Sequence, residues 1–261
     1  MRAIWSGSIG FGLVNIPVRL FSAVHDSTLD LDMLDKRGHA NIRYARINSS
    51  TGKEVAWENI VKGYKYHDHY VVLTDEDFEK ASPKKSKMID IESFVKEEGI
   101  DTTFYDTPYY LEPTKGGEKA YVLLREALKQ SGKVAIGTYI IRAKENLCVL
   151  KPQNDMLLLL KIRFAEEIRD YKELNIPKDI TVKPAELKMA QALINQLTPK
   201  KFSIAQYKDT YDAALMKIIE AKAKGTKITQ PRFKIVQSKS KDIMDQLKAS
   251  LSAGTTRKKA S

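Results

Sequence analysis

Seven Lys and Arg residues stand between residues 34 and 66, where only three acidic residues accompany them. Aromatic side chains lie between these cations, and this pattern suits a groove or a phosphate backbone better than a protein core. A solvated surface hairpin explains the same charges from this segment alone. The candidate phosphate-binding residues are Lys36, Arg37, Arg43, Arg46, Lys53, Lys62 and Lys65.

Residues 41–66, which carry most of these cations, read as two extended arms joined by a polar turn at residues 48–52. Asn, Ser and Gly at such a position reverse the direction of a chain. In the first arm, strict alternation puts Arg46 on the same side as Tyr44, so we expect either a β-bulge or a position at the rim of a barrel. A further apolar strand is predicted at residues 70–73.

The remaining apolar pattern predicts a β-rich domain. Three apolar segments, at residues 134–142, 147–151 and 156–163, follow one another across short polar turns. Short connections favour antiparallel pairing, and apolar residues on both faces indicate a barrel or a covered sheet. Other strands are predicted at residues 13–21, 87–91 and 103–112.

Helical spacing of apolar residues predicts helices at residues 116–131, from Pro184 onward and at residues 209–224. The pattern of Thr74 followed three residues later by Asp77 is typical of a helix N-terminus and predicts a short helix there. The helix that begins at Pro184 has one apolar stripe, formed by Leu187, Ala190, Ile194 and Leu197.

The end of the chain is basic, with eight cations and two acids in residues 231–261, after a predicted linker at residues 226–231. A short helix in this tail has a narrow apolar stripe that cannot form a core of its own. Such a stripe is typical of a segment that docks on a partner, and packing against the main domain is the alternative. The stripe consists of Ile243, Met244, Leu247 and Leu251.

Composition limits the classes of function. The formal net charge of +11 points to a polyanionic partner, most often nucleic acid. The single cysteine, Cys148, excludes an internal disulfide framework and a multi-cysteine zinc site, so we expect an intracellular protein. The N-terminal segment has too many glycines for a signal peptide, and no apolar run reaches the ~18 residues of a membrane span.

Enzyme signatures are absent from the sequence. There is no phosphate-binding glycine loop followed by Lys-Ser or Lys-Thr, no dinucleotide fingerprint and no nucleophile elbow. The possible metal ligands are His67 with His69, the acidic residues 75–77, and Glu166 with Glu167. A hairpin end, helix capping and divergent side chains explain them better. We therefore expect binding without catalysis, and neither a metal nor a cofactor.

A series of sequence blocks follows the whole chain in order, beginning with MRAIWSGSIGFGLVNIPVRL at residues 1–20. It continues with GKEV and VKGY in the basic segment, YVVLTDEDF at residues 70–78 and YYLEP at residues 109–113. It ends with LREAL at residues 124–128, AIG at residues 135–137, IEAK at residues 219–222 and LKASL at residues 247–251. In these blocks the sequence resembles the bacterial Ku family, the DNA-end-binding proteins of nonhomologous end joining.

The resemblance implies a mixed β and α fold in which an antiparallel β-barrel carries an inserted bridge and is followed by C-terminal helices. We expect a core over residues 1–230, with the bridge at about residues 34–66 and dimerisation helices at about residues 184–224. Residues 231–261 would form the basic tail with its amphipathic helix. Two copies would close a homodimeric ring around duplex DNA, in the cytoplasm at the bacterial nucleoid.

The resemblance also implies the partners, which are double-stranded DNA ends, a second copy of the chain and an ATP-dependent DNA ligase D. The tail stripe would dock the ligase. Some relatives have cysteines where this chain has residues 48–50, and some have longer lysine-rich tails, so neither metal binding nor tail-driven condensation is carried over. The alternatives are a nucleoid-type duplex binder, an RNA-binding barrel or, from the acidic clusters, a nuclease.

Overall fold

Two compact units, Met1–Tyr171 and Lys172–Ser261, make up the computed structural model. It describes residues 1–81, 87–142, 144–226 and 243–257, with side chains up to residue 252. All but the first residue of the predicted linker at residues 226–231 and about half of the basic tail lie outside the described residues. The predicted boundary at residue 230 also lies outside them and stays a prediction.

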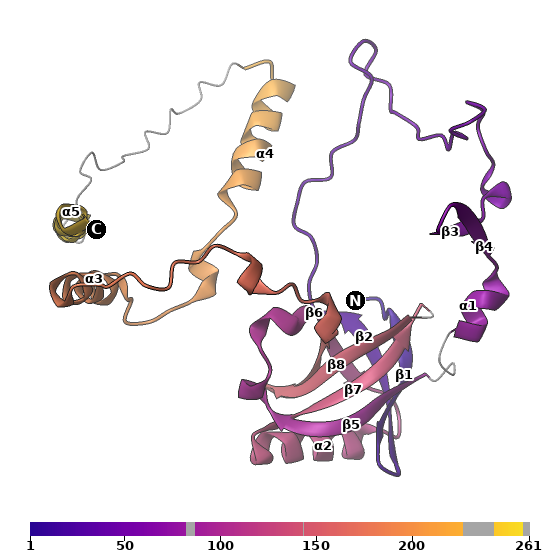
Figure 1. The fold of residues 1–261 in the computed structure, drawn as a ribbon, viewed down its shortest axis with the longest axis horizontal. Coiled ribbons are helices and arrows are strands. Elements are labelled where there is room, and N and C mark those ends of the chain that lie inside the picture. Colours follow the sequence, from indigo (N-terminus) through magenta and orange to yellow (C-terminus); the bar gives the residue numbers. More distant parts are fainter. Residues whose placement is uncertain (82–86, 143, 227–242, 258–261) are drawn as a thin grey trace. The chain divides into compact units, whose positions relative to one another are not determined.

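A closed β-barrel forms the centre of the first unit (Figure 1). Its strands lie in the order β1, β2, β6, β9, β8, β7 and β5. Among these described strands, every pairing is antiparallel except that of β1 with β5, which is parallel. The strands are β1 (Trp5–Phe11), β2 (Val14–Ser22), β5 (Met88–Lys96), β6 (Tyr105–Pro113), β7 (Lys133–Ile141), β8 (Lys144–Gln153) and β9 (Met156–Ile162).

The predicted antiparallel barrel is therefore confirmed apart from the closing pair. Parallel neighbours need a long crossover connection, and the segment between β2 and β5 supplies it. Alternation puts one set of side chains into the barrel, where Ile16, Leu20 and Leu150 are fully buried. A second cluster, around Val149, lies on the other face of the strands beneath the 3₁₀ segments η2 (Glu97–Gly99) and η3 (Thr102–Phe104).

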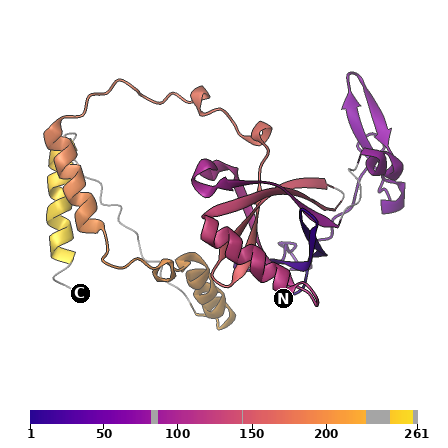
Figure 2. The same cartoon turned by 90° about the horizontal axis from the view of Figure 1, so that it is seen from below.

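Helix α2 (Glu118–Ser131) packs against the barrel and contacts β2, β7 and β8 (Figure 2). Its apolar stripe places Tyr121, Leu124 and Leu128 in the barrel core. Gly132 ends the helix with φ of 63°, a left-handed conformation that costs glycine little. The predicted helix and its stop signal are both confirmed.

The long connection between β2 and β5 contains the short helical turn η1 (Trp57–Asn59), strands β3 (Lys62–Tyr66) and β4 (His69–Leu73), and helix α1 (Asp75–Ala81). Thr74 and Asp77 cap α1 reciprocally, because the Asp77 amide donates to Thr74 Oγ1 at 3.3 Å and the Thr74 amide donates to Asp77 Oδ2 at 2.9 Å. The hydrogen bonds from the Thr74 backbone and hydroxyl hold the pKa of Asp77 below its usual value. Asp77 therefore serves helix capping, and Asp75 and Glu76 lie with it in the first turn of the helix, as predicted.

The second unit contains the helices α3 (Pro184–Leu197), α4 (Thr210–Ala223) and α5 (Ile243–Arg257) and the short turn η6 (Ile204–Gln206). The predicted helix starts are confirmed: Pro184 is the first residue of α3, and Asp209 caps α4 by accepting hydrogen bonds from the amides of Tyr211 and Asp212. The short turns η4 (Ala165–Glu167) and η5 (Tyr171–Glu173) precede them. Within the described part of the chain, no helix has the length and apolar character needed to cross a membrane.

Candidate nucleic-acid interface

The segment from Leu34 to Tyr66, which we call the ribbon, is held by local turns. At residues 48–52, Asn48 Oδ1 accepts hydrogen bonds from the amides of Ser50 and Thr51, at 2.9 and 3.1 Å. An isolated β-bridge joins Ile47 to Glu54 next to this turn. The predicted polar turn is therefore confirmed, and Lys53 lies at its end.

The predicted pair of long arms is wrong. Residues 41–47 form no strand, and β3 pairs with β4 instead of with the first arm. The sequence favoured the longer hairpin because the polar turn at residues 48–52 lies between two apolar and basic segments. The chain instead forms two short loops and then the β3–β4 hairpin, so neither a bulge nor a barrel rim explains the position of Arg46.

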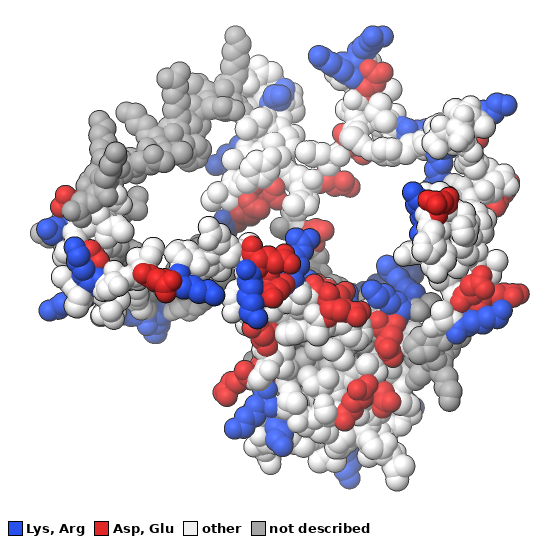
Figure 3. Space-filling view, in the orientation of Figure 1, with Lys and Arg blue, Asp and Glu red and all other residues white. Residues whose placement is uncertain are grey.

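The first loop presents Lys36 and Arg37. A β-bridge joins Leu34 to Asn41 at its base, and the Asp35 carboxylate accepts a hydrogen bond from the Arg37 amide at 2.7 Å. The aspartate thus uses its charge to fix the loop backbone, while both cationic side chains stay exposed. Figure 3 shows blue side chains gathered on the loop at the top of the view.

Aromatic rings hold two of the other cations. The Arg46 guanidinium lies over the Trp57 ring, 4.4 Å from its centroid, and Lys62 Nζ lies 4.7 Å from the centroid of the Phe78 ring. The Trp57 ring covers one face of the planar guanidinium and leaves its N–H edge available, and the Phe78 ring covers one side of the ammonium group, which has three N–H donors. Such a cation is oriented before it meets a phosphate.

The β3–β4 hairpin separates two predicted cations. Side chains alternate along a strand, so Lys62 lies on the face with Tyr64 and Tyr66, and Lys65 lies on the opposite face. One flat contact cannot include both lysines. At the hairpin turn, His67 has a φ of 52° and lies outside the strands, as expected for a hairpin end, so it does not share a strand face with His69.

All seven predicted cations of the ribbon are exposed. Within the part of the chain that the structure describes, none of them forms an ion pair. The barrel differs, since residues 87–171 contain thirteen Lys and Arg and fourteen Asp and Glu, several of them paired. The excess positive charge is therefore carried by the ribbon and the C-terminal third, and it is available to an anionic partner.

The prediction from sequence omitted one exposed basic segment of the second unit, residues 198–208. It contains Lys200, Lys201 and Lys208 and no acidic residue. The exposed rings of Phe202 and Tyr207 lie within it, with centroids 6.2 Å apart. The alternation of cations and aromatic residues, which pointed to the ribbon, is the signal that could have found it.

The ribbon and its continuation lack a core of their own. No residue between 24 and 81 is buried, and Tyr64, Tyr70 and Val72 are more than half exposed on the two faces of the hairpin. A two-stranded hairpin is at best marginally stable alone in water. These surfaces therefore suit contact with another macromolecule.

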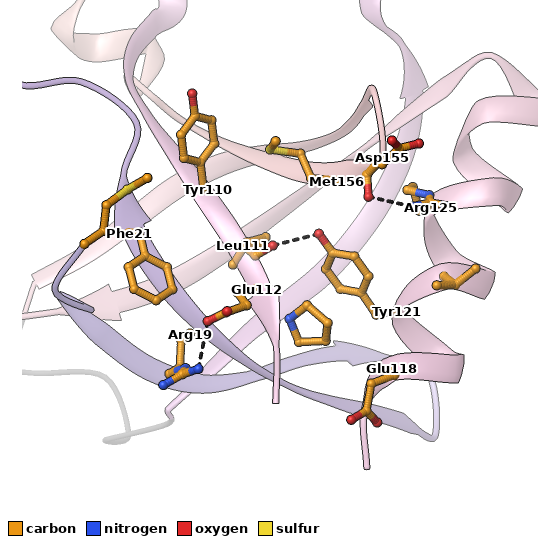
Figure 4. Close-up of a pocket in the computed structure, with 13 residues that line it drawn as sticks. Arg19, Phe21, Tyr110, Leu111, Glu112, Glu118, Tyr121, Arg125, Asp155 and Met156 are labelled. Atoms are coloured by element: carbon orange, nitrogen blue, oxygen red, sulfur yellow. Dashed lines mark hydrogen bonds and ion pairs between the residues drawn. The ribbon is translucent and has the colours of Figure 1, made fainter. Parts of the chain in front are cut away.

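The barrel has an open pocket on its outer surface beside α2 (Figure 4). Phe21 pairs with Tyr110 across β2 and β6, and Arg19 pairs with Glu112, their charged atoms 2.9 Å apart. The thirteen lining residues include no His, Cys or Ser, and their opposite charges are largely matched. The pocket therefore contains neither a Ser–His nor a Cys–His pair.

The possible metal ligands also have structural roles or remain dispersed. Glu167 Oε2 accepts a hydrogen bond from the Phe164 amide at 2.8 Å, so this carboxylate caps a short turn. Among the described residues, no group of three or more His, Cys, Asp and Glu side chains has the geometry to hold a metal ion. Cys148 is fully buried, and burial raises the pKa of its thiol above the usual value.

The predicted stripe of the tail lies on α5, which packs against α3. Met244, Leu247 and Leu251 are partly buried, whereas Ile243 is 61% exposed. Three of the four stripe residues therefore lie on a face of α5 that packs against another helix of the second unit. Docking of a partner on this stripe stays a prediction.

Comparisons with known proteins agree with this architecture. The family model described as the Ku70/Ku80 beta-barrel domain matches residues 10–189. A protein of Coxiella burnetii named non-homologous end joining protein Ku is 39% identical over 258 residues, which cover 96% of this chain and 94% of the relative. Proteins with the same name from Cupriavidus necator and Archaeoglobus fulgidus are 44% and 38% identical, covering 88% and 97% of this chain and 69% and 99% of theirs.

Among solved structures, the SPOC domain of human PHD-finger protein 3 matches at 11% identity, with a TM-score of 0.31, covering 62% of this chain and 97% of that one. A likeness of this size carries no conclusion. The family model and the named relatives, which span most of the chain, decide the assignment. The chain belongs to the Ku family.

Proposed function

We propose that this protein binds the ends of double-stranded DNA without sequence preference and acts in double-strand break repair by nonhomologous end joining. The observation that carries the proposal is the set of seven exposed ribbon cations without ion pairs among the described residues. The names of its relatives support the same pathway. The protein would act in the cytoplasm, at the bacterial chromosome, without a catalytic step of its own.

Sequence-independent binding follows from the types of residue on the ribbon. Lys and Arg contact phosphate and sugar, which are the same at every base pair. Each neutralised phosphate releases counterions, so the affinity should fall steeply with salt. The basic segment at residues 198–208 would add contacts of the same kind from the second unit.

The functional form would be a ring made of two copies. The segment between residues 24 and 81 and the described part of the second unit contain no fully buried residue, although both are rich in apolar side chains. On α3, Leu187, Ile194 and Leu197 are more than half exposed. A second copy that covered these surfaces would supply the missing core and bring two ribbons around one duplex.

A competition assay tests end binding. The protein is bound to a labelled linear duplex, and unlabelled competitor of identical sequence is added as linear or as closed circular DNA. A ring that threads onto ends is displaced by the linear competitor only. Equal competition by the circle would show a general duplex binder, which is the alternative from another class.

The second part of the proposal is recruitment of an ATP-dependent DNA ligase D through α5. A helix with apolar residues at spacings of three and four fits a hydrophobic groove of a partner. The test measures end joining by the ligase with the full chain and with Leu247→Asp. Stimulation should disappear while DNA-end affinity is unchanged, and full stimulation by the variant would contradict the docking role.

A further inference from the structure

The apolar face of helix α5 already packs against another helix, α3. Met244, Leu247 and Leu251 are spaced three and four residues apart, and all three are partly buried where α5 packs against α3. On the α3 side, Met189, Ala190 and Leu193 are partly buried. The Gln196 side-chain amide donates a hydrogen bond to the Leu251 carbonyl at 3.2 Å.

Helix α3 uses different residues for its two apolar faces. The residues that face α5 lie at positions 189, 190 and 193, whereas Leu187, Ile194 and Leu197 are 52%, 63% and 69% exposed. At 100° per residue, Met189 and Leu193 lie on one side of the helix and Leu187 and Ile194 on the adjoining side, with Ala190 and Leu197 between the two pairs. The two faces therefore adjoin, and Met189 and Leu193 are the α5-facing residues that lie farthest from Leu187 and Ile194.

The contact between α3 and α5 buries its residues only partly. None of the described residues on either helix is fully buried, so a small apolar surface holds α5, together with interactions such as the hydrogen bond from the Gln196 amide to the Leu251 carbonyl. Elements with few buried contacts open locally at low free energy. The α3–α5 contact is suited to exchange with another binding surface.

We propose that α3 competes with the ligase for the same face of α5, so that the chain covers its own docking helix until the partner displaces α3. The inference rests on the proposed ligase docking and adds a regulatory step to it. The partner must offer an apolar groove that accepts Met244, Leu247 and Leu251. Its apparent affinity is reduced by the fraction of chains in which α5 is covered.

Substitutions on α3 distinguish the covering of α5 by α3 from the docking of α5 on the ligase. Leu193→Asp puts a charge against α5, and Ala192→Asp puts the same charge on the neighbouring exposed position of the same helix. A milder double variant, Met189→Ala with Leu193→Ala, removes contact area without adding charge. All variants are full-length chains. Their affinities for DNA ends are checked first, so that ligase binding is compared between proteins that bind DNA ends equally well.

Two measurements are made on each variant. Hydrogen exchange of the amides in residues 243–252 reports covering directly, and binding to the purified ligase reports docking. We expect Leu193→Asp and the double variant to exchange faster and bind the ligase more tightly. If α5 is covered in about 90% of chains, release raises the affinity about tenfold. Ala192→Asp should behave as the wild type.

Each of the other outcomes contradicts a different part of the proposal. Unchanged exchange in both α3 variants would show that α3 does not cover α5. Faster exchange with unchanged ligase affinity would show that the two partners do not compete. If the ligase binds the wild type, the α3 variants and Leu247→Asp all equally, the ligase docks elsewhere. The proposed docking function and the competition then both fail, although exchange still measures the α3–α5 contact.

Discussion

The guanidinium group of Arg46 lies 4.4 Å from the centroid of the Trp57 ring. The two residues are linked locally as well, because the Val55 amide donates to the Arg46 carbonyl at 2.8 Å and holds the chain close before it reaches Trp57. Trp57 is 72% exposed, so its ring contributes little to a core. Its main role in the described structure is to orient a cation that we propose to contact DNA.

Replacing Trp57 by Leu should therefore weaken DNA-end binding with little effect on folding. A cation–π interaction at an exposed site is worth about 0.5–1 kcal/mol, which corresponds to a decrease in affinity of about two- to fivefold per site. Fluorescence anisotropy with a labelled blunt duplex measures the change. Trp57→Phe is the matched control, since it keeps a ring, and a Leu variant with wild-type affinity would show that the ring does not position Arg46 for binding.

Tyr121 should matter for stability and not for DNA contact. Its hydroxyl donates to the Leu111 carbonyl at 2.7 Å and accepts from the Leu157 amide at 2.6 Å, so it joins β6 to β9 inside the barrel. Tyr121→Phe leaves both buried backbone groups without this partner, and we expect a decrease of about 1–3 kcal/mol in the free energy of unfolding. Urea unfolding measures it, with Tyr110→Phe on the outer surface as the control. Equal midpoints for the two variants would refute the bridging role.

Asp106 should make part of the barrel's stability depend on pH. Partial burial raises its pKa, but the hydrogen bond and charge of Lys161, with the charge of Arg163, outweigh burial and hold the pKa below its ordinary value. The carboxylate oxygens lie 3.1 Å from Lys161 Nζ and 3.3 Å from Arg163 Nη2.

A carboxyl group with a lowered folded pKa stabilises the fold above its unfolded pKa of about 3.9, and this stabilisation is lost as the pH falls through the folded pKa. Asp106→Asn should therefore lower the free energy of unfolding by up to about 1 kcal/mol at pH 7. The difference from the wild type should disappear at strongly acidic pH, while the exposed control Asp155→Asn stays close to the wild type throughout. A deficit that persisted at acidic pH would assign the effect to packing.

The exposed face of α3 should control assembly. Ile194→Asp puts a charge into the surface that we propose a second copy covers, whereas Ala192→Asp puts it on an exposed residue two positions earlier in the same helix. Sedimentation velocity should show a monomer or a strongly weakened dimer for the first variant and a wild-type dimer for the second. If both variants dimerise like the wild type, the interface lies elsewhere.

Local patterns in the sequence predict the local parts of this fold well. The alternation in residues 13–21 places Ile16, Val18 and Leu20 in the core, and Gly132 ends α2 where a left-handed residue is required. The barrel closure is different, because the parallel pairing of β1 with β5 joins segments about eighty residues apart and has no local signal. The Ku resemblance supplied the barrel, but no residue pattern supplied that pairing.

The candidate site shows the same limit. Charge composition predicts that the ribbon is exposed and basic, since unpaired cations are costly to bury. It does not predict that Lys62 and Lys65 face opposite ways, because the choice of β4 as the partner of β3 sets their faces. Nor does the stripe on α5 reveal that α3 covers it, since helical spacing fits either partner.

The central claim is that the ribbon cations hold DNA ends, and charge reversal tests it most directly. The double variant Arg43→Glu with Arg46→Glu is compared with Lys115→Glu with Lys144→Glu, two exposed lysines on the barrel unit, so that both variants change the net charge equally. End affinity for a blunt duplex is measured across a series of salt concentrations. We predict that the ribbon variant binds far more weakly and that its salt slope falls by about 0.9 for each phosphate that the protein no longer neutralises, while the barrel variant keeps the wild-type slope. Wild-type affinity and slope in the ribbon variant would contradict the account.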